Sequence, residues 1–344
     1  MSTVTITDVA KRVGVSVATI SRYLSGFTVR NEEEIRDAIV ELNYRPSAAA
    51  RNLKSGRTGI IAIVVPDVTN PFFAAIVEGA ESAVGGDRMI LLVNTAGVRE
   101  REEKALSQLF GRVDGIILVP ATEDQEGISF FSKLGLPIVF VDRVTHEKEL
   151  FSTVLSDNVK GAKLAVQSLI GHGHSRIAMI SGPLRSTPGK TRADGYRQSM
   201  KAAKLPIEDG YFLESDFSEE GGYQSMETLL QLPYPPTAVF TANNLMTIGA
   251  LRALRDNGVR TPEDISIIGF DDLECAELIN PPISVIARDA RLQGAIAMAS
   301  MIKHLDEVGG AEPEHSMVDV QLVERGSCAP PRESQKIRSN KKDH

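Results

Sequence analysis

The sequence predicts a small all-α unit at the N-terminus, followed by a larger α/β unit with two parallel sheets. In residues 1–45, apolar residues recur at the three- and four-residue spacing of amphipathic helices. From Gly59 onwards, short apolar runs alternate with longer amphipathic segments, which indicates parallel strands buried on both faces and joined by helices. The chain has 344 residues, too many for one compact core of typical size, so two or three structural units are expected.

Three short helices are expected in the N-terminal unit. Thr5 and Asp8 have the spacing of a capping box, so the first helix should begin directly after Thr5 and end at Gly14. Ser16 is placed to cap the second helix by accepting from a backbone N–H of its first turn. Asn31 repeats this start signal for the third helix.

About nine strands are expected in the α/β unit, which suggests two sheets. The apolar runs that predict them are 60–65, 89–94, 115–119, 138–141, 153–156, 177–181, 238–242, 265–270 and 283–287. The segments between them predict helices at 71–84, 101–112, 159–170, 193–203, 221–230, 245–257 and 290–305. The tail, 330–344, has almost no apolar residues and is expected to be disordered.

Composition restricts the classes of function. Lys and Arg number 38 against 45 Asp and Glu, a net charge of −7, which excludes a uniformly basic coat for nucleic acid. Residues 1–57 nevertheless hold nine basic and six acidic residues, so this segment is +3 and the rest, with 29 basic and 39 acidic residues, is −10. The two cysteines, Cys275 and Cys328, form neither a disulfide framework nor the spacing of a zinc site, so we expect no metal and a reducing, cytoplasmic location. No apolar stretch predicts a signal peptide or a membrane span.

A helix-turn-helix is predicted where Gly14-Val15-Ser16 joins the first two helices. The second helix, 17–24, would enter the major groove of DNA, where Arg22 can bind guanine through two hydrogen bonds. The residues expected to reach base edges or phosphates are Thr5, Ser16, Val17, Ala18, Thr19, Ser21, Arg22 and Asn31. A helical protein-interaction module with a solvated polar face is the alternative, because this pattern has many false matches.

Polar and aromatic side chains follow the predicted strands of the α/β unit. Parallel sheets bind ligands at the carboxyl ends of their strands, where loops and helix N-termini converge. These ends carry Asp67–Phe73, Asn94-Thr95, Asp142-Arg143, Asp157-Asn158, Gly182–Arg192, Phe217, Asn243-Asn244 and Asp271-Asp272. Carboxylate and guanidinium groups hold arrays of hydroxyls, and aromatic faces cover the C–H face of a sugar ring, so a polyhydroxylated ligand is expected.

Several longer segments occur in one order, namely TITDVAKRVGVSVATISRYLSG, LNYRPSAAARNLKSGRTGIIAIVVPDVTNPFF, RVDGIILVP, HGHSRIAMISGP, PTAVFTANN and ISIIGFDD. Over about residues 3–328 the chain closely resembles the lactose/galactose repressor (LacI/GalR) family of transcriptional regulators. The resemblance implies a helix-turn-helix headpiece (1–46), a hinge helix and linker (47–58) and a two-lobed core (59–329) similar to periplasmic sugar-binding proteins. One lobe would comprise about 59–158 and 289–317, and the other about 159–288 and 318–329.

In that family the paired hinge helices of a dimer enter the minor groove, which implies roles for the stretch SAAARNLKSGR. Leu53 would wedge between central base pairs, because an apolar wedge unstacks a step and the kinked DNA offers further contacts. Ala49, Ala50 and Asn52 would lie against the groove floor or the partner helix, and Arg51 and Lys54 would contact phosphates or groove edges. The stretch is too short to be a stable helix alone in water, so it should be a conditional one.

The resemblance also implies an effector site between the two lobes. Arg192 matches the arginine that clamps effector, Asp271 the carboxylate that accepts its hydroxyls, and Asn243 the cleft amide. The other implied contacts are Phe72, Phe73, Asp142, Arg143, Ser186 and Phe217, and the variable loop around Ser186 adds Pro188 and Lys190. Lys190 leaves open a phosphorylated or carboxylated effector in place of a neutral sugar. In the alternative interpretation, Asn243 and Asp271 merely cap helices, and Phe73 belongs to the core.

The favoured function is therefore a homodimeric repressor that binds a pseudo-palindromic operator and responds to a small-molecule effector. The dimer surface is expected on the Pro71–Val84 helix and on the second lobe, and the sequence leaves open whether the effector releases the protein from DNA or recruits it. A sugar-binding transport protein is the alternative from another class, although it would lack the helix-turn-helix. An enzyme has no supporting motif, since His172 and His174 indicate a structural turn and the adjacent Asp271 and Asp272 side chains should point in opposite directions.

Overall fold

The computed structural model describes residues 4–24, 26–44, 57–86, 88–145, 148–273, 276–307 and 311–332. The chain divides into two compact units, Met1–Gly59 and Ile60–His344. The tail beyond Arg332 lies outside the described residues, as do the predicted hinge contacts Ala49, Ala50, Arg51, Asn52, Leu53 and Lys54.

The N-terminal unit has three helices in its described part, α1 (Ile6–Val13), α2 (Val17–Leu24) and α3 (Glu32–Glu41). They pack around Val9, Ile20 and Ile35, whose side chains are fully buried. One apolar residue from each helix thus meets in a small common core, which is what the helical spacing predicts.

All three helices begin where predicted, and the predicted side-chain caps form at two of them. The Asp8 carboxylate accepts from the backbone N–H of Thr5 at 2.9 Å, and Ser16 Oγ accepts from the backbone N–H of residue 19 at 3.1 Å. Gly14 ends α1 in the left-handed conformation with φ 76°. The helix α3 begins directly after Asn31 as predicted, but Asn31 has φ 75° and its side chain makes no capping hydrogen bond. The Glu32 side chain instead accepts from the backbone N–H of Val29 at 3.0 Å.

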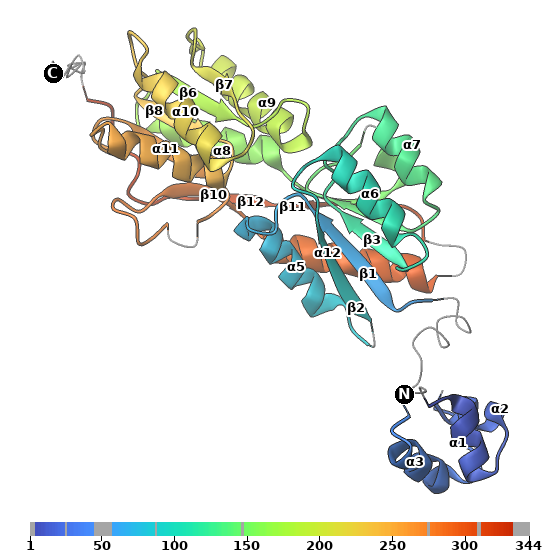
Figure 1. Cartoon of the computed structure of the whole chain (residues 1–344). Helices are drawn as coiled ribbons and strands as arrows, with labels where there is room; N and C mark the ends of the chain where they lie inside the picture. The colour runs from blue at the N-terminus through green and yellow to red at the C-terminus, as the bar shows by residue number, and fades with distance from the viewer. Residues whose placement is uncertain are drawn as a thin grey trace. The chain divides into compact units, whose positions relative to one another are not determined.

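The second unit contains two six-stranded sheets, one in each of two lobes (Figure 1). The first-lobe sheet has the order β11-β5-β4-β3-β1-β2 and is entirely parallel. Its strands are β1 (Ile60–Val65), β2 (Met89–Asn94), β3 (Gly115–Leu118), β4 (Ile138–Val141), β5 (Ser152–Ser156) and β11 (His315–Val318). The second-lobe sheet has the order β12-β10-β9-β8-β6-β7, with β12 antiparallel to β10 and the other pairs parallel. Its strands are β6 (Ile177–Ser181), β7 (Phe212–Glu214), β8 (Ala238–Thr241), β9 (Ser266–Phe270), β10 (Ser284–Arg288) and β12 (Val320–Val323).

Helices cover both faces of each sheet, as in other doubly wound α/β units (Figure 1). The first lobe has α5 (Pro71–Ala83), α6 (Arg99–Leu109), α7 (Gln125–Lys133) and α12 (Ala290–Asp306), with the 3₁₀ turn Lys148–Leu150 before β5. The second lobe has α8 (Asn158–Gly171), α9 (Thr187–Ala202), α10 (Glu219–Leu230) and α11 (Asn244–Asp256). The helices α5 and α12 approach so closely that a Cβ added to Gly294 would lie 1.9 Å from the carbonyl oxygen of Ile76.

The predicted fold class is correct, and the strands that the prediction missed share one feature. Twelve strands occur in the described parts of the core, against about nine predicted, and the additional ones are β7, β11 and β12. Each lies at an edge of its sheet and is partly exposed, so its sequence lacks the continuous apolar run of a buried parallel strand. The predicted helix 193–203 in fact begins at Thr187, because Ser186 caps it there. No prediction was made for α7.

The chain passes between the lobes three times, after β5, after β10 and between β11 and β12. The carboxyl ends of the central strands of both sheets point toward this junction, which brings their terminal residues together. Among the described residues, no helix is long and apolar enough to span a membrane.

Candidate functional site

The helix α2 presents one face to solvent. Val17, Ala18 and Arg22 are exposed, whereas Ile20 on the other side is fully buried. The Arg22 guanidinium carbon lies 5.8 Å from the centre of the exposed Phe27 ring, so the charged group is held by a weak cation–π contact and remains accessible. A short helix with two small apolar residues and one arginine on its outer face has the shape and chemistry to read a major groove.

The other predicted DNA contacts surround this face. Thr5, Ser16 and Asn31 are exposed, and Thr19 and Ser21 are half-buried. The hydroxyls of Ser16 and Thr19 lie 2.9 Å apart, and Thr5 Oγ1 donates to Asp8 at 2.7 Å. These hydroxyls therefore lie at the starts of α1 and α2, where helix N-termini attract phosphate groups.

The junction between the lobes of the core contains a small inner pocket of about 40 Å³. Eight of the nine predicted effector contacts line it, namely Phe72, Phe73, Asp142, Arg143, Arg192, Phe217, Asn243 and Asp271. The ninth, Ser186, caps α9 and lines a larger cavity of about 760 Å³, together with Lys190. The two cavities share Asn70, Phe73, Arg143 and Phe217 as lining residues, so they form one continuous site.

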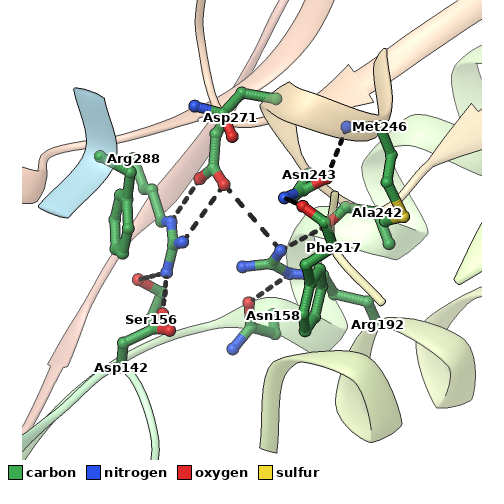
Figure 2. A network of polar contacts seen from close by, with 12 residues as sticks. Asp142, Ser156, Asn158, Arg192, Phe217, Ala242, Asn243, Met246, Asp271 and Arg288 are labelled. Carbon is green, nitrogen blue, oxygen red and sulfur yellow. Dashed lines mark hydrogen bonds and ion pairs between the residues drawn. The ribbon is translucent and has the colours of Figure 1, made fainter. Parts of the chain in front are cut away.

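Arg288, the last residue of β10, lines the inner pocket and lies between Asp271 and Asp142 (Figure 2). Its Nε donates to Asp271 Oδ1 at 2.5 Å in the second lobe, and its Nη1 donates to Asp142 in the first lobe. The guanidinium lies flat over the Phe72 ring, 3.6 Å from the ring centre, and the Arg288 side chain is only 3% exposed. One buried cation therefore links carboxylates from both lobes.

Arg192, on α9, is the second buried guanidinium of the pocket. Its Nε donates to Asn158 Oδ1 at 2.8 Å, and its Nη1 donates to the backbone carbonyl of Ala242 (Figure 2). The guanidinium carbon lies 3.6 Å from the centre of the Phe270 ring, and Nη1 is 4.0 Å from Asp271 Oδ2. The Arg192 side chain is 1% exposed, and its Nη2 has no hydrogen-bond partner.

Burial and charge act against each other in this network. Burial lowers the pKa of Arg192 to about 9, and the positive charge of Arg288 contributes to the same shift. Although burial alone would raise the pKa of Asp142, the positive charges of Arg288, Arg192 and Arg143 hold it below its ordinary value. The pKa of Arg288 is raised despite its burial, because Asp271 and Asp142 stabilise the charged form.

Three of the predicted site residues have backbone conformations that side chains other than glycine seldom adopt. Asp142 has φ 65°, Phe217 has φ 68° and Asp271 has φ 69°. Such conformations cost free energy and are found where surrounding contacts hold a side chain in a functional orientation. Asn243 supplies part of this support, because its Nδ2 donates to the carbonyl oxygen of Phe217 at 2.9 Å (Figure 2). Its Oδ1 accepts from the backbone N–H of Met246 at 2.9 Å, so Asn243 also caps α11.

Two further sets of contacts join the lobes. Asn70, before α5, and Asn244, at the start of α11, exchange two amide hydrogen bonds of 3.3 and 2.9 Å, and both residues are buried. At the other side, the backbone N–H of Thr187 donates to both oxygens of Glu123 at 2.9 and 2.8 Å. Thr187 Oγ1 in turn accepts from the backbone N–H of Val144 at 3.2 Å.

The effector contacts predicted from the sequence do not include Arg288 or Glu123, and they include Asn70 only within the strand-end segment Asp67–Phe73. The sequence does contain a signal for Arg288, because this charged residue directly follows the apolar run ISVIA, just as Asp142 follows IVFV. Glu123 lies in the loop before α7, for which no element was predicted, so its position was not accessible to pattern analysis.

The histidines and the acidic pair have other partners than a metal or a substrate. His174 is buried and contacts Thr237 Oγ1 at 2.9 Å and Ser266 Oγ at 3.0 Å, and burial lowers its pKa to about 4. Asp272 pairs with Arg325 at 2.9 Å, whereas Asp271 faces Arg288. In the described part of the chain, no group of three or more His, Cys, Asp or Glu side chains has the arrangement of a metal site.

Comparison with known proteins gives matches over both units. Residues 5–47 match the family model "Bacterial regulatory proteins, lacI family", and residues 166–328 match a periplasmic binding protein-like domain. The ribose operon repressor of Escherichia coli K12 is 36% identical over 331 residues, which cover 94% of this chain and 99% of the relative.

Solved structures agree with these matches. A lac repressor dimer bound to operator and to the anti-inducer ONPF superposes with a TM-score of 0.84 at 27% identity, covering 95% of this chain and 100% of the other. A complex of the transcriptional regulator CelR with cellobiose has a TM-score of 0.72 at 30% identity, covering 94% and 99%.

Proposed function

This chain belongs to the lacI family of bacterial regulatory proteins, and from this premise we propose that it is a homodimeric repressor whose operator affinity is set by a sugar or sugar derivative bound between the lobes. The family consists of DNA-binding repressors controlled by an effector in the core, not of enzymes. The observation that carries the effector part of the proposal is the buried network of Arg288, Arg192, Asp142 and Asp271, because polar groups from both lobes converge there. A regulator of operator DNA acts in the cytoplasm, so we place this protein there.

We assign DNA reading to α2, with Arg22 bonding a guanine and Val17 and Ala18 contacting apolar base edges. Thr5, Ser16, Thr19, Ser21 and Asn31 would position the headpiece on the phosphates. In the hinge, Leu53 would unstack a base step in the minor groove. Ala49, Ala50 and Asn52 would lie against the groove floor or the partner helix, and Lys54 would contact phosphates or groove edges. Leu53→Ala should then weaken specific operator binding more than non-specific binding, and equal losses would contradict this role.

The proposal of a homodimer is supported by an exposed apolar edge. Met89, Leu91 and Leu92 of β2 are 66%, 41% and 44% exposed, and β2 is the edge strand of the first-lobe sheet. Exposed apolar edge strands invite association, so a second copy of the chain that covers this edge and the adjacent α5 explains its composition. Leu91→Glu should lower the molar mass measured by analytical ultracentrifugation from dimer to monomer, and a dimer that persists would place the interface elsewhere.

In this proposal the effector contacts Phe72, Phe73, Asp142, Arg143, Ser186, Arg192, Phe217, Asn243 and Asp271. Because these residues come from both lobes, binding changes the angle between the lobes. In a dimer that angle changes the spacing of the two hinge segments, which then form or lose their helices. The effector would thus select one of two states of the hinge by its differential affinity for them.

A thermal-shift screen with sugars, sugar acids and sugar phosphates tests this function, because a ligand that binds the folded state raises Tm. A compound that raises Tm is then added to an operator-binding assay, which distinguishes release from recruitment. Arg192→Ala should retain operator binding and lose the response to that compound. A response that survives this substitution would refute the proposed site, and a protein that binds no duplex DNA with sequence preference would refute the function.

A further inference from the structure

Arg288 and other groups of the chain already bond several acceptors of the inner pocket. Both oxygens of Asp271 face Arg288, at 2.5 Å from Nε and 3.3 Å from Nη2. Asn158 Oδ1 accepts from Arg192, and Asn243 Oδ1 accepts from the backbone of α11. Each of these acceptors is therefore already engaged by a group of the protein itself.

Donors, by contrast, remain. Arg192 Nη2 and Arg143 Nε are both buried and have no hydrogen-bond partner. Figure 2 shows the unbonded nitrogen of Arg192 directed toward the side of the pocket where Arg288 and Asp142 lie. A buried guanidinium nitrogen without an acceptor is costly, and a ligand that brings an acceptor removes that cost.

The charges of the side chains that line the inner pocket also favour an anionic ligand group. Arg192 and Arg288 repel each other, and this repulsion contributes to the lowered pKa of Arg192. Arg143 also lines the pocket, so three guanidinium groups face two carboxylates, Asp142 and Asp271. The pocket itself thus carries one positive charge in excess.

Two other acidic groups interact with Arg143 and have to be considered. The Glu123 carboxylate is held by the backbone N–H and hydroxyl of Thr187, and Glu102 Oε2 accepts from the backbone N–H of Ala121 at 2.7 Å. Burial raises the pKa of both groups, that of Glu102 to about 7. Both carboxylates are therefore bound outside the inner pocket, and neither supplies an acceptor to Arg192.

We propose that the effector carries a carboxylate that enters the inner pocket and accepts from Arg192 and Arg143, and that Arg288 sets this preference by occupying Asp142 and Asp271. The inference rests on the proposed function and names the chemical class of its effector, a sugar acid. The inner pocket of about 40 Å³ has room for a small group such as a carboxylate. The polyhydroxylated body occupies the adjoining cavity of about 760 Å³, which is of ordinary size for a ligand site.

The experiment measures binding by isothermal titration calorimetry and thermal shift, using the full-length protein and matched pairs of neutral sugar and sugar acid. The pairs are D-glucose with D-gluconate and D-glucuronate, and D-ribose with D-ribonate, with D-glucose 6-phosphate as a third arm. At least one acid is expected to bind about tenfold or more tightly than its neutral partner, as charge-assisted hydrogen bonds predict. Raising the salt concentration should weaken this binding only slightly, because the pairing groups are buried.

Two variants locate the effect. Arg288→Gln frees both carboxylates to accept hydroxyls, so the ratio of acid to neutral affinity should fall toward one or invert. Arg143→Gln should weaken the acid without affecting the neutral sugar. Arg255→Gln, an exposed arginine at the far end of α11, makes the same change of charge and should leave the ratio unchanged.

The outcomes separate this inference from the function on which it rests. A neutral sugar that binds the wild-type protein more tightly than every acid overturns the inference and leaves an effector-controlled repressor. Binding of the sugar phosphate alone overturns the assignment of a carboxylate. An acid preference that Arg288→Gln does not alter overturns the role of Arg288, and the wild-type arms decide the class of effector even where a variant does not fold. If no compound of either class binds, both this inference and the sugar-controlled function fail.

Discussion

Replacing Asn244 by alanine is expected to loosen the contact between the lobes without changing either sheet. Asn244 exchanges two hydrogen bonds with Asn70 across the junction, and the two side chains are 2% and 6% exposed. The substitution removes both bonds and leaves the buried Nδ2 of Asn70 without that acceptor, whereas Asn70 Oδ1 keeps the backbone N–H of Phe72. Losing these hydrogen bonds destabilises the state in which the lobes are in contact by about 1–2 kcal/mol, and it does not affect the state in which they are apart. The equilibrium for separation of the lobes should therefore rise about 5- to 30-fold.

The backbone N–H of Thr187 provides a direct measure of this equilibrium. Thr187 is the first residue of α9, so its N–H has no acceptor within the helix, and it donates instead to Glu123 of the other lobe. Amide hydrogen exchange at Thr187 therefore requires separation of the lobes, and its rate should rise by the same 5- to 30-fold in Asn244→Ala. Asn257→Ala, at the far end of the same helix with contacts inside the second lobe only, serves as the matched control. Unchanged exchange at Thr187 in a folded Asn244→Ala protein would refute the argument that this amide pair holds the lobes together.

Three further predictions concern DNA binding, pH and packing. Arg22→Ala should weaken operator binding, measured by fluorescence anisotropy, by about 1–3 kcal/mol without changing Tm. Arg36 is also exposed, and Arg36→Ala should change operator affinity little. Equal losses of affinity in the two variants would contradict a base contact by Arg22. Because burial lowers the pKa of His174 to about 4, the unfolded chain binds a proton there that the folded chain does not, and stability falls as pH drops below about 6.5. Urea unfolding should show this histidine's share as about 2 kcal/mol lost between pH 7 and pH 5, and His174→Gln should remove that share; a slope that the variant retains would assign it to other groups. Gly294→Ala should lower the free energy of unfolding by about 1–3 kcal/mol, because the added Cβ would strike the α5 backbone. Gly171 has open space around it, so Gly171→Ala should leave stability nearly unchanged. Equal effects of the two substitutions would contradict close packing of α5 on α12.

The fold could be predicted from the sequence where the chain is buried on both sides. Continuous apolar runs such as 60–65 and 265–270 are typical of parallel strands buried on both faces, so these runs predict the central strands. The edge strands β7, β11 and β12 have mixed patterns because one side or one edge is solvated, and a mixed run of three or four residues does not distinguish a strand from a loop. Asn31 shows a related limit, since its residue type predicts a cap but not the left-handed backbone that prevents one.

The sequence predicts the position of the candidate site better than it predicts the hydrogen bonds and ion pairs within it. Eight predicted residues line one pocket, because the carboxyl ends of parallel strands converge irrespective of which side chains they carry. Which groups bond to each other depends on side-chain length and on the crossing of the chain between lobes, neither of which a local pattern records. Arg288 bonds Asp142 across 146 positions of sequence and also pairs with Asp271, and neither contact could be predicted from a local pattern.

The contacts across the junction also limit what an effector can do to the lobes. Arg288 joins Asp142 to Asp271, and Asn70 joins Asn244, using only groups of the chain itself. A ligand shifts a conformational equilibrium only by the difference between its affinities for the two states, so an effector that merely replaced these bonds would shift nothing. Under the proposed function, a bond from the ligand to the unsatisfied Arg192 Nη2 or Arg143 Nε shifts the lobes to the extent that it forms in only one of the two states. We therefore expect the response to effector to depend on these buried donors more than on the bonds that already hold the lobes together.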